Sequence, residues 1–152
     1  MQIKVYTDGG LSAKNEVGGW AAVIVHEDGT RKAIQGHYKG ADVTNNKMEL
    51  TAVIEALKYL AYHHEGQECE IVSDSEYIVK GVTEWAEGWI RKGWKSTTGP
   101  VKNQDYWKQL LALNETVKPK FSWVRGHDGD ENNELADSLA VSSYKKIIDE
   151  NK

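Results

Sequence analysis

From residue 20 to residue 38 the chain reads WAAVIVHEDGTRKAIQGHY, a pattern that predicts a β-hairpin. An apolar run comes first, the pair Asp28-Gly29 supplies a turn of the kind that hairpins use, and a second strand follows over residues 31–38. Upstream, residues 2–7 alternate apolar and polar side chains with the period of a strand, and Asp8-Gly9-Gly10 is expected to end that strand with a turn. The chain is therefore expected to open with three antiparallel strands.

Downstream of this hairpin the period becomes helical over residues 46–63, with Asn45 or Asn46 available as the N-cap. The short run EIVS at residues 70–73 predicts a fourth strand, which a crossover through the helix lays parallel to the first. The remaining expected elements are helical segments at 75–90 broken near Gly81, a loop at 93–100, a helix at 104–114, a strand at 120–124, a polar loop at 126–132 and a helix at about 133–148. The predicted fold class is α/β, with a mixed five-stranded sheet of three antiparallel and then two parallel strands, flanked by helices.

The length of 152 residues predicts that residues 1–152 form a single domain. With 39% hydrophobic and 28% charged residues, the composition is globular rather than fibrous or disordered. No run approaches the roughly 18 apolar residues of a membrane span, and the N-terminus lacks the pattern of a secretory signal. Cys69, the one cysteine, cannot form an intrachain disulfide. These features predict a cytoplasmic protein without a membrane segment.

The charge is distributed unevenly along the chain. Lysine and arginine total 19 against 23 acidic residues, a net charge of −4, which argues against a protein that coats nucleic acid by bulk charge. Residues 88–108 oppose this balance with five basic residues and one acid, and four of the six tryptophans lie in or beside them. A charge run alone is more often a solvated helix face over core aromatics, so that interpretation stays open beside a binding surface.

Four acidic residues, Asp8, Glu49, Asp74 and Asp137, stand at the margins of apolar elements. Asp8 and Asp74 end the two strands expected to be parallel, and ligands usually bind at the carboxyl ends of such strands. Glu49 and Asp137 each lie one turn into a predicted helix. Carboxylates that approach a core repel one another and lose hydration, which is unfavourable unless a cation joins them. Two Mg²⁺ ions would balance the four charges and could hydrolyse a phosphodiester, although each acid taken singly could be a solvated or capping residue.

Five stretches of the chain resemble type 1 ribonuclease H in its bacterial form. They run in order along the sequence as YTDGG (6–10), TNNKMEL (44–50), SDSEY (73–77), GWKSTTGPVKNQDYW (93–107) and WVRGHDGDENNELAD (123–137). The resemblance implies a ribonuclease H-like fold and an endonuclease that hydrolyses the RNA strand of RNA–DNA hybrids, independently of sequence, leaving 3′-hydroxyl and 5′-phosphate ends. It also implies two Mg²⁺ ions in the presence of substrate, with Mn²⁺ as a substitute.

The resemblance also implies roles for individual residues. The metal-binding catalytic acids are Asp8, Glu49, Asp74 and Asp137, and His127 assists proton transfer or product departure. The expected substrate contacts are Asn45 and Asn46 in the minor groove, Thr44 and Asn15 at phosphates, and a basic protrusion against the DNA strand with Trp85, Trp89, Arg91, Lys92, Lys95 and Lys102. This chain departs from many bacterial relatives in having GLSAKNEV near Asn15 and uncharged Gly88 and Ile90 in the protrusion.

Three other functions compete with this one. A transposase, integrase or junction-cleaving nuclease would share an acid cluster but cut DNA, and the asparagine pair with the tryptophan-rich protrusion argues against it. A non-catalytic hybrid-binding module would not need all four acids. A two-carboxylate glycosidase explains neither four acids nor a basic groove. The expected partner is the hybrid duplex alone, bound by a monomer that needs no protein partner and no membrane.

Overall fold

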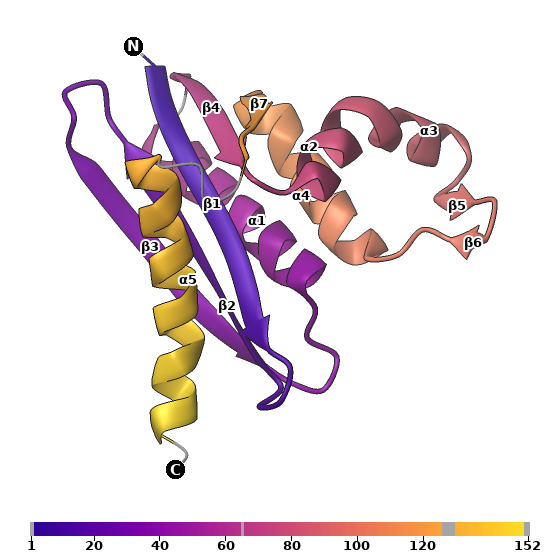
Figure 1. The fold of residues 1–152 in the computed structure, drawn as a ribbon. Coiled ribbons are helices and arrows are strands. Elements are labelled where there is room, and N and C mark those ends of the chain that lie inside the picture. Colours follow the sequence, from indigo (N-terminus) through magenta and orange to yellow (C-terminus); the bar gives the residue numbers. More distant parts are fainter. Residues whose placement is uncertain (1, 65, 126–129, 151–152) are drawn as a thin grey trace.

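The computed structural model describes residues 2–64, 66–125 and 130–150 and is built around a mixed five-stranded sheet (Figure 1). The strand order is β3-β2-β1-β4-β7. β1 pairs antiparallel with β2 and parallel with β4, β2 pairs antiparallel with β3, and β4 pairs parallel with β7. The strands are β1 (Gln2–Ser12), β2 (Val17–Val25), β3 (Arg31–Lys39), β4 (Glu68–Ser73) and β7 (Lys120–Trp123). The predicted sheet of three antiparallel and then two parallel strands is confirmed.

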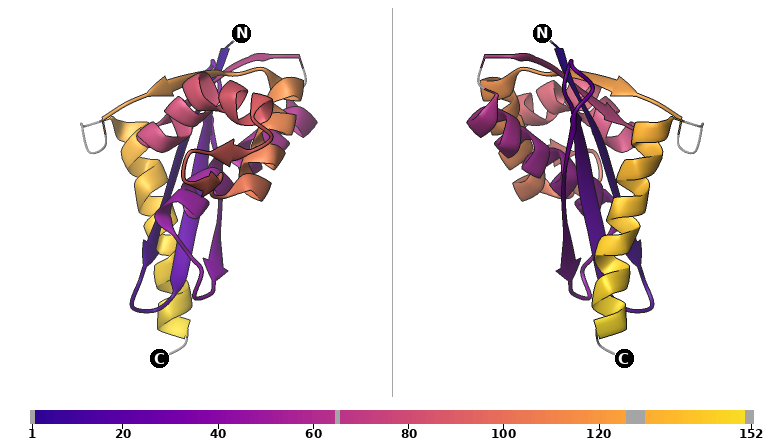
Figure 2. Two further views of the ribbon diagram at one scale, coloured as in Figure 1. Left: turned by 90° about the vertical axis from the view of Figure 1, so that its right-hand side faces the viewer. Right: turned by 90° about the vertical axis from the view of Figure 1, so that its left-hand side faces the viewer.

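Helices cover both faces of the sheet. Figure 2 shows α5 on one side and α1 with α4 on the other. The helical elements are α1 (Asn45–His63), α2 (Glu76–Lys80), the π-helix η1 (Gly81–Trp85), α3 (Ala86–Arg91), α4 (Gln104–Val117) and α5 (Glu131–Glu150). A small hairpin of β5 (Lys95–Ser96) and β6 (Gly99–Pro100) occupies the segment predicted to be a loop. In the part of the chain that the structure describes, no helix is both long and apolar enough to cross a membrane.

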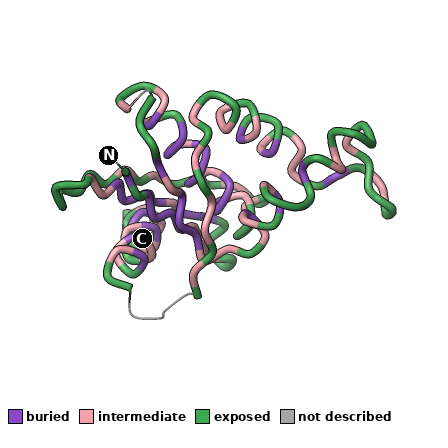
Figure 3. The backbone as a smooth tube through the Cα atoms, turned by 90° about the horizontal axis from the view of Figure 1, so that it is seen from above, coloured by how far each residue is buried: buried purple, intermediate pink, exposed green. Residues whose placement is uncertain are grey.

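Alternation along the strands divides the core between the two faces. In β1, Ile3 and Val5 pack into the cluster beneath α1 and α4, whereas Tyr6 packs into the cluster beneath α5. In β2, Ile24 and Val23 divide in the same way, as the period of two residues in a strand requires. Figure 3 shows the buried positions concentrated in the sheet and its facing helices, whereas the segment that carries α3, β5 and β6 stands away from them.

The first strand is longer than its sequence pattern predicts. The expectation that Asp8-Gly9-Gly10 ends it with a turn is wrong, because β1 continues to Ser12 and stays paired with β2 up to Ser12 opposite Val17. Gly9 serves a close approach instead of a turn: a Cβ at this position would lie 2.5 Å from the carbonyl carbon of Met48 and 2.6 Å from the amide nitrogen of Glu49. The absent side chain lets β1 pass directly against the first turn of α1.

The start of α1 also differs from the expectation. Neither Asn45 nor Asn46 is the N-cap, because Thr44 takes that position with extended backbone angles, and its Oγ1 accepts a hydrogen bond from the Lys47 amide at 3.1 Å. A threonine hydroxyl placed here satisfies one of the free amides of the first turn. The two asparagines are therefore the first two residues of the helix. The expected interruption near Gly81 is present as the π-helix η1.

Candidate active site

Three of the four predicted acids meet at one edge of the parallel strands. Asp8, Glu49 and Asp74 each offer one carboxylate oxygen, and these oxygens all lie within 4.8 Å of one another. The last parallel pair between β1 and β4 is Thr7 opposite Ser73, so Asp8 and Asp74 each follow directly after it. Although β1 continues, the parallel ladder ends where the sequence predicted, and this brings the two acids side by side.

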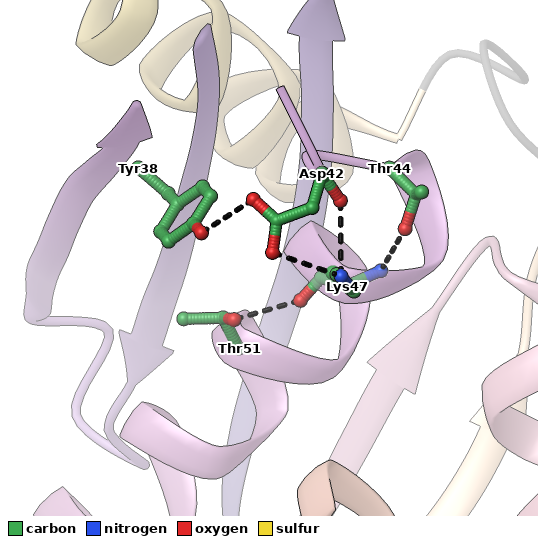
Figure 4. Close-up of polar contacts among 5 residues, drawn as sticks. All are labelled: Tyr38, Asp42, Thr44, Lys47 and Thr51. Carbon is green, nitrogen blue, oxygen red and sulfur yellow. Dashed lines mark hydrogen bonds and ion pairs between the residues drawn. The ribbon is translucent and has the colours of Figure 1, made fainter. Parts of the chain in front are cut away.

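Glu49 enters the cluster from the first turns of α1, where its side chain is buried. A polar network fixes the segment that leads into this helix (Figure 4). The Tyr38 hydroxyl donates to Asp42 at 2.6 Å, and the Lys47 ammonium donates to the carbonyl oxygen of Asp42 at 3.0 Å and to its Oδ2 at 3.3 Å. The connection from β3 to α1 is thereby tied to both elements, close to the start of the helix that carries Glu49.

The close approach at Gly9 gives a testable requirement for this geometry. We expect Gly9→Ala to destabilise the fold by about 1–3 kcal/mol, because the added methyl group overlaps the backbone of Met48 and forces β1 away from α1. Cleavage activity should fall as well, since the spacing of Asp8 and Glu49 changes. The measurements are urea unfolding and nuclease assays. Gly88→Ala is the matched control, because a Cβ there meets nothing within 4 Å. Equal stability of the two variants would contradict the close-approach interpretation.

Asp137 reaches the same region from α5 and is half-buried. It lies close enough to Asp8 for its charge and a hydrogen bond to raise the pKa of that acid. The helix can pack this closely because Gly19 in β2 has no side chain: a Cβ there would overlap the carbonyl oxygen of Ala140. The fourth predicted acid therefore stands beside the three that share the cluster.

The acids of the cluster are buried beside one another, and this disfavours their charged forms. Burial raises the pKa of Asp8 to about 7; a hydrogen bond with Glu49 opposes the rise, and Asp137 and Asp74 add to it. Burial and the neighbouring charge of Asp8 raise the pKa of Glu49 well above its usual range. Glu49 Oε1 is buried and has no hydrogen-bond partner among the residues that the structure describes. A divalent cation would satisfy this oxygen and remove the repulsion.

The donor set fits the metal that the sequence predicted. Every ligand atom offered by Asp8, Glu49 and Asp74 is a carboxylate oxygen, the ligand type that Mg²⁺ and Mn²⁺ prefer over sulfur or imidazole. With Asp137 beside them, the four acids form what is called here the carboxylate cluster: Asp8, Glu49, Asp74 and Asp137.

The predicted contacts of the minor groove and phosphates lie at two places. Thr44, Asn45 and Asn46 are exposed at the start of α1, beside Glu49. Asn15 is exposed in the turn after β1, where its Nδ2 donates to Ser12 Oγ at 2.8 Å. Four residues of strand separate Asp8 from Ser12, roughly 13 Å, so Asn15 stands apart from the carboxylate cluster.

The basic protrusion, residues 85–102, is built on tryptophans whose rings pack against one another at an angle. Trp89 has ring centroids of Trp85, Trp94 and Trp107 at 6.0, 6.0 and 5.1 Å. Trp107 is fully buried, Trp89 is half-buried against the core, and Trp85 is 40% exposed. Trp89 therefore serves mainly as packing, and Trp85 offers the larger ring surface. The basic side chains of the protrusion are exposed, and none forms an ion pair with an acid among the described residues: Arg91, Lys92, Lys95 and Lys102.

A cavity between the starts of α1 and α4 was not predicted from the sequence. It is open to solvent, has a volume of about 430 Å³ and is lined by Lys47, Asn103 and Gln104, among others. Asn103 adopts the left-handed conformation at φ 61°, which asparagine tolerates better than most residues, and its side chain donates to Tyr77. An asparagine directly before a helical stretch was the available signal for a special backbone position. His127, the predicted proton-transfer residue, lies outside the described residues.

The sheet and the carboxylate cluster define an α/β protein that can hold divalent cations at the ends of parallel strands. The RNase H family model matches residues 1–145. The chain is 46% identical over 148 residues to "Ribonuclease H" of Geotalea uraniireducens, covering 95% of each chain. The chain belongs to the ribonuclease H family, a family of endoribonucleases.

Two solved structures show the same fold. LC9-RNase H1, described as a type 1 RNase H with the type 2 active-site motif, superimposes with a TM-score of 0.82 at 29% identity, covering 95% of this chain and 72% of that one. LC11-RNase H1, solved in complex with an RNA/DNA hybrid, gives a TM-score of 0.75 at 23% identity and covers 96% of this chain and 99% of that one. The predicted ribonuclease H-like fold is confirmed.

Proposed function

We propose that this chain hydrolyses the RNA strand of RNA–DNA hybrids with two Mg²⁺ ions held by the carboxylate cluster. The observation that carries the proposal is the meeting of three acids, from β1, α1 and the end of β4, within 4.8 Å of one another. The family membership supports RNA cleavage, and the hybrid bound to LC11-RNase H1 supports the substrate class. Mn²⁺ can substitute, because it accepts the same oxygen ligands.

The reaction replaces one bond to phosphorus by another. A water molecule loses a proton to solvent and its oxygen bonds to phosphorus as the bond to the 3′ oxygen of the ribose breaks. The 3′ oxygen takes up a proton, which leaves a 3′-hydroxyl and a 5′-phosphate. Two divalent cations, when bound, would activate the water and stabilise the leaving oxygen. Asp8, Glu49, Asp74 and Asp137 would hold these ions, and the burial of Asp8 and Glu49 keeps their oxygens preorganised for the task.

Residues at the start of α1 are proposed to distinguish the RNA strand from the DNA strand. The 2′-hydroxyl distinguishes RNA from DNA and is reached from the wide, shallow minor groove of an A-like duplex. Asn45 and Asn46 are exposed at the start of α1, next to Glu49. The Glu49 carboxylate can accept a hydrogen bond from the ribose 2′-hydroxyl while it binds metal. Thr44 remains a candidate phosphate contact, since a hydroxyl that accepts from the Lys47 amide can still donate.

The basic protrusion is proposed to bind the phosphates of the DNA strand, which predicts how hybrid affinity depends on salt concentration. We expect the triple variant Arg91→Ala, Lys92→Ala, Lys95→Ala to bind all hybrid sequences more weakly and with a flatter salt dependence. Each side chain that no longer pairs with a phosphate lowers the slope of log affinity against log salt by up to about 0.9. Turnover at saturating hybrid should change much less than affinity. The measurement is hybrid affinity over a series of salt concentrations.

The matched control for this variant removes three exposed lysines elsewhere: Lys32→Ala, Lys145→Ala, Lys146→Ala. These lysines lie on the edge strand β3 and on α5, and Figure 1 shows both elements at the opposite side of the molecule from α3. A slope that is unchanged in the first variant, or lowered equally in both, would mean that the protrusion is a solvated face.

His127 is proposed to assist proton transfer without being indispensable. We expect His127→Ala to lower turnover by about 10²-fold or less, the lower end of the range for general acid–base catalysis, with hybrid affinity nearly unchanged. The pH–rate profile of the variant should also change in shape, because a titrating group has been removed. Wild-type turnover with an identical profile would assign His127 to a solvated loop.

The chain is proposed to be a single domain that acts alone. Residues 1–152 form a single domain, and the chain works as a cytoplasmic monomer without an obligatory protein partner. The continuous sheet and the clusters on its two faces support one domain, and relatives from bacteria such as Geotalea uraniireducens support the compartment. Sedimentation of the protein with and without hybrid tests the monomer, and a dimer in either state contradicts it.

The substrate proposal is tested by comparing three labelled duplexes: an RNA–DNA hybrid, double-stranded RNA and double-stranded DNA. Each is incubated with Mg²⁺ and with EDTA. We expect cleavage of the hybrid alone, and only with Mg²⁺. Cleavage of double-stranded DNA would instead support a transposase- or integrase-like nuclease, and hybrid binding without cleavage would support a binding module.

A further inference from the structure

Two histidines meet at the end of the sheet opposite the carboxylate cluster. His26 follows β2 in the turn to β3, and His64 caps the C-terminus of α1. Their Nε2 atoms lie 3.4 Å apart, and the ring centroids are 5.1 Å apart with the planes inclined by 58°. Fifteen residues separate His64 from Glu49 along α1, roughly 22 Å of helix. This histidine pair is therefore separate from the site proposed for catalysis.

The separation of the two nitrogens matches shared coordination of one metal ion. Zinc binds histidine nitrogen at about 2.0–2.1 Å in tetrahedral geometry, so two nitrogens on the same ion lie roughly 3.3–3.4 Å apart. The observed 3.4 Å between the Nε2 atoms has this value. Imidazole nitrogen is a ligand preferred by Zn²⁺, Cu²⁺ and Ni²⁺, whereas Mg²⁺ takes oxygen ligands.

The tautomer of His26 suits metal binding. Its Nδ1 lies 3.2 Å from the carbonyl oxygen of Thr30, and a carbonyl oxygen can only accept, so Nδ1 carries the proton. In the neutral ring the Nε2 lone pair then faces His64. Histidine ligands in proteins almost always donate their other ring N–H to a carboxylate or a backbone carbonyl in this way. The backbone of the turn is itself fixed, since the His26 amide donates to Thr30 at 2.8 Å.

The surroundings of the two histidines are acidic and leave room for water. His26 and His64 line a cavity of about 210 Å³ together with Glu27 and Asp28. Hydrogen bonds from Thr30 hold the pKa of Asp28 below its usual range, so this carboxylate is charged at neutral pH. Burial and the neighbouring imidazoles lower the pKa of His64, which keeps that ring uncharged at neutral pH. The two imidazoles supply two ligands, and the cavity leaves room for water molecules to complete a four-ligand shell.

We propose that His26 and His64 bind one divalent transition-metal ion, with Zn²⁺ as the representative, between the β2–β3 turn and the end of α1. Neither ligand lies within the family's acid motifs, and the proposal does not depend on the catalytic function. A bound ion joins two segments that are 38 residues apart, so it should stabilise the fold by binding the native state and not the unfolded chain.

The test is a Zn²⁺ titration of the whole protein in excess Mg²⁺, which keeps the carboxylate cluster occupied. Calorimetry gives affinity and stoichiometry, thermal unfolding gives the stabilisation, and long-range proton–nitrogen NMR of the imidazoles shows which nitrogens bind. The variants are His26→Gln and His64→Gln. His63→Gln is the matched control, because His63 is the exposed neighbour of His64 and contacts Tyr59 and Tyr62 instead of the cavity.

We expect one Zn²⁺ per wild-type chain, a higher melting temperature, and shifted Nε2 signals of His26 and His64. The control should behave like wild type. Each ligand variant should lose at least about tenfold in affinity, since even the loss of an outer-shell partner costs 10- to 100-fold. No Zn²⁺ binding by wild type, binding that both ligand variants retain in full, or unshifted Nε2 signals would overturn the proposal and leave a hydrogen bond between the two rings.

Discussion

Replacing Asp74 with asparagine is expected to abolish hybrid cleavage almost completely while hybrid binding is retained. The substitution keeps the size of the side chain but removes one negative charge and a strong metal ligand from the cluster it forms with Asp8 and Glu49. Binding survives because the repulsion between the cluster and the phosphates decreases as catalysis is lost. The measurements are single-turnover cleavage and hybrid affinity, both in Mg²⁺.

Glu76→Gln is the matched control for this variant, because Glu76 lies two residues further on, is exposed and pairs with Lys80 instead of the cluster. The control should cleave at the wild-type rate. Activity of Asp74→Asn within about tenfold of wild type, a barrier change of only about 1.4 kcal/mol, would contradict a metal-binding role for Asp74.

The second large effect concerns the stability of the metal-free protein. The pKa of Asp8 is raised from 3.8 to about 7, mainly by burial, so between these two pH values the native state holds a proton that the unfolded chain has lost. The Asp8 side chain therefore costs no stability below about pH 4. The free energy of unfolding then falls as the pH rises from about 4 through about 7. The rise corresponds to up to roughly 4 kcal/mol, at 1.36 kcal/mol for each pKa unit.

Asp8→Asn should remove this loss. At about pH 8 without metal, we expect the variant to be more stable than wild type by a few kcal/mol, with a much smaller difference at about pH 4. Mg²⁺ should stabilise wild type at the higher pH and have little effect on the variant. Urea unfolding at the two pH values, with and without Mg²⁺, makes the comparison. A variant that is less stable than wild type at about pH 8 would contradict the account of Asp8 as a repelled, buried charge.

The parts of the fold with a strong local signal were predictable from sequence. The hairpin turn at Asp28-Gly29, the helical period of α1 and the apolar run of β4 each predicted an element that the structure contains. The parallel pairing of β1 and β4 followed from the crossover between them, and with it the meeting of Asp8 and Asp74. Local sequence patterns and one crossover connection were sufficient to predict that Asp8 and Asp74 lie side by side.

Other features depend on contacts between distant segments. Gly9 resembles a turn residue in sequence, and only the first turn of α1 packed against it shows that it permits a close approach. The cap of α1 is a different case, because its contacts are local: Thr44 accepts from the Lys47 amide, and Tyr38 and Lys47 both bond to Asp42. The close approach at Gly9 is a tertiary contact that no local pattern contains.

The surroundings of the tryptophans and of the histidine pair could not be predicted from local sequence patterns either. Trp89 and Trp85 have similar sequence surroundings, yet Trp89 packs between three other rings while Trp85 is exposed. The pair His26 and His64 has no sequence signature at all, since 38 residues separate them and neither belongs to a recognisable ligand motif. Only the register of β2 and the length of α1 bring the two rings together.

The carboxylate cluster is proposed to direct a water molecule at the RNA strand of a hybrid, and the chemical ends of the products report which strand and which bond it cuts. Each strand of a hybrid is labelled in turn, and the fragments formed in Mg²⁺ are analysed for their termini. We expect cuts in the RNA strand alone, with 3′-hydroxyl and 5′-phosphate ends. Cuts in the DNA strand, or RNA fragments ending in a 2′,3′-cyclic phosphate from attack by the neighbouring ribose hydroxyl, would contradict it.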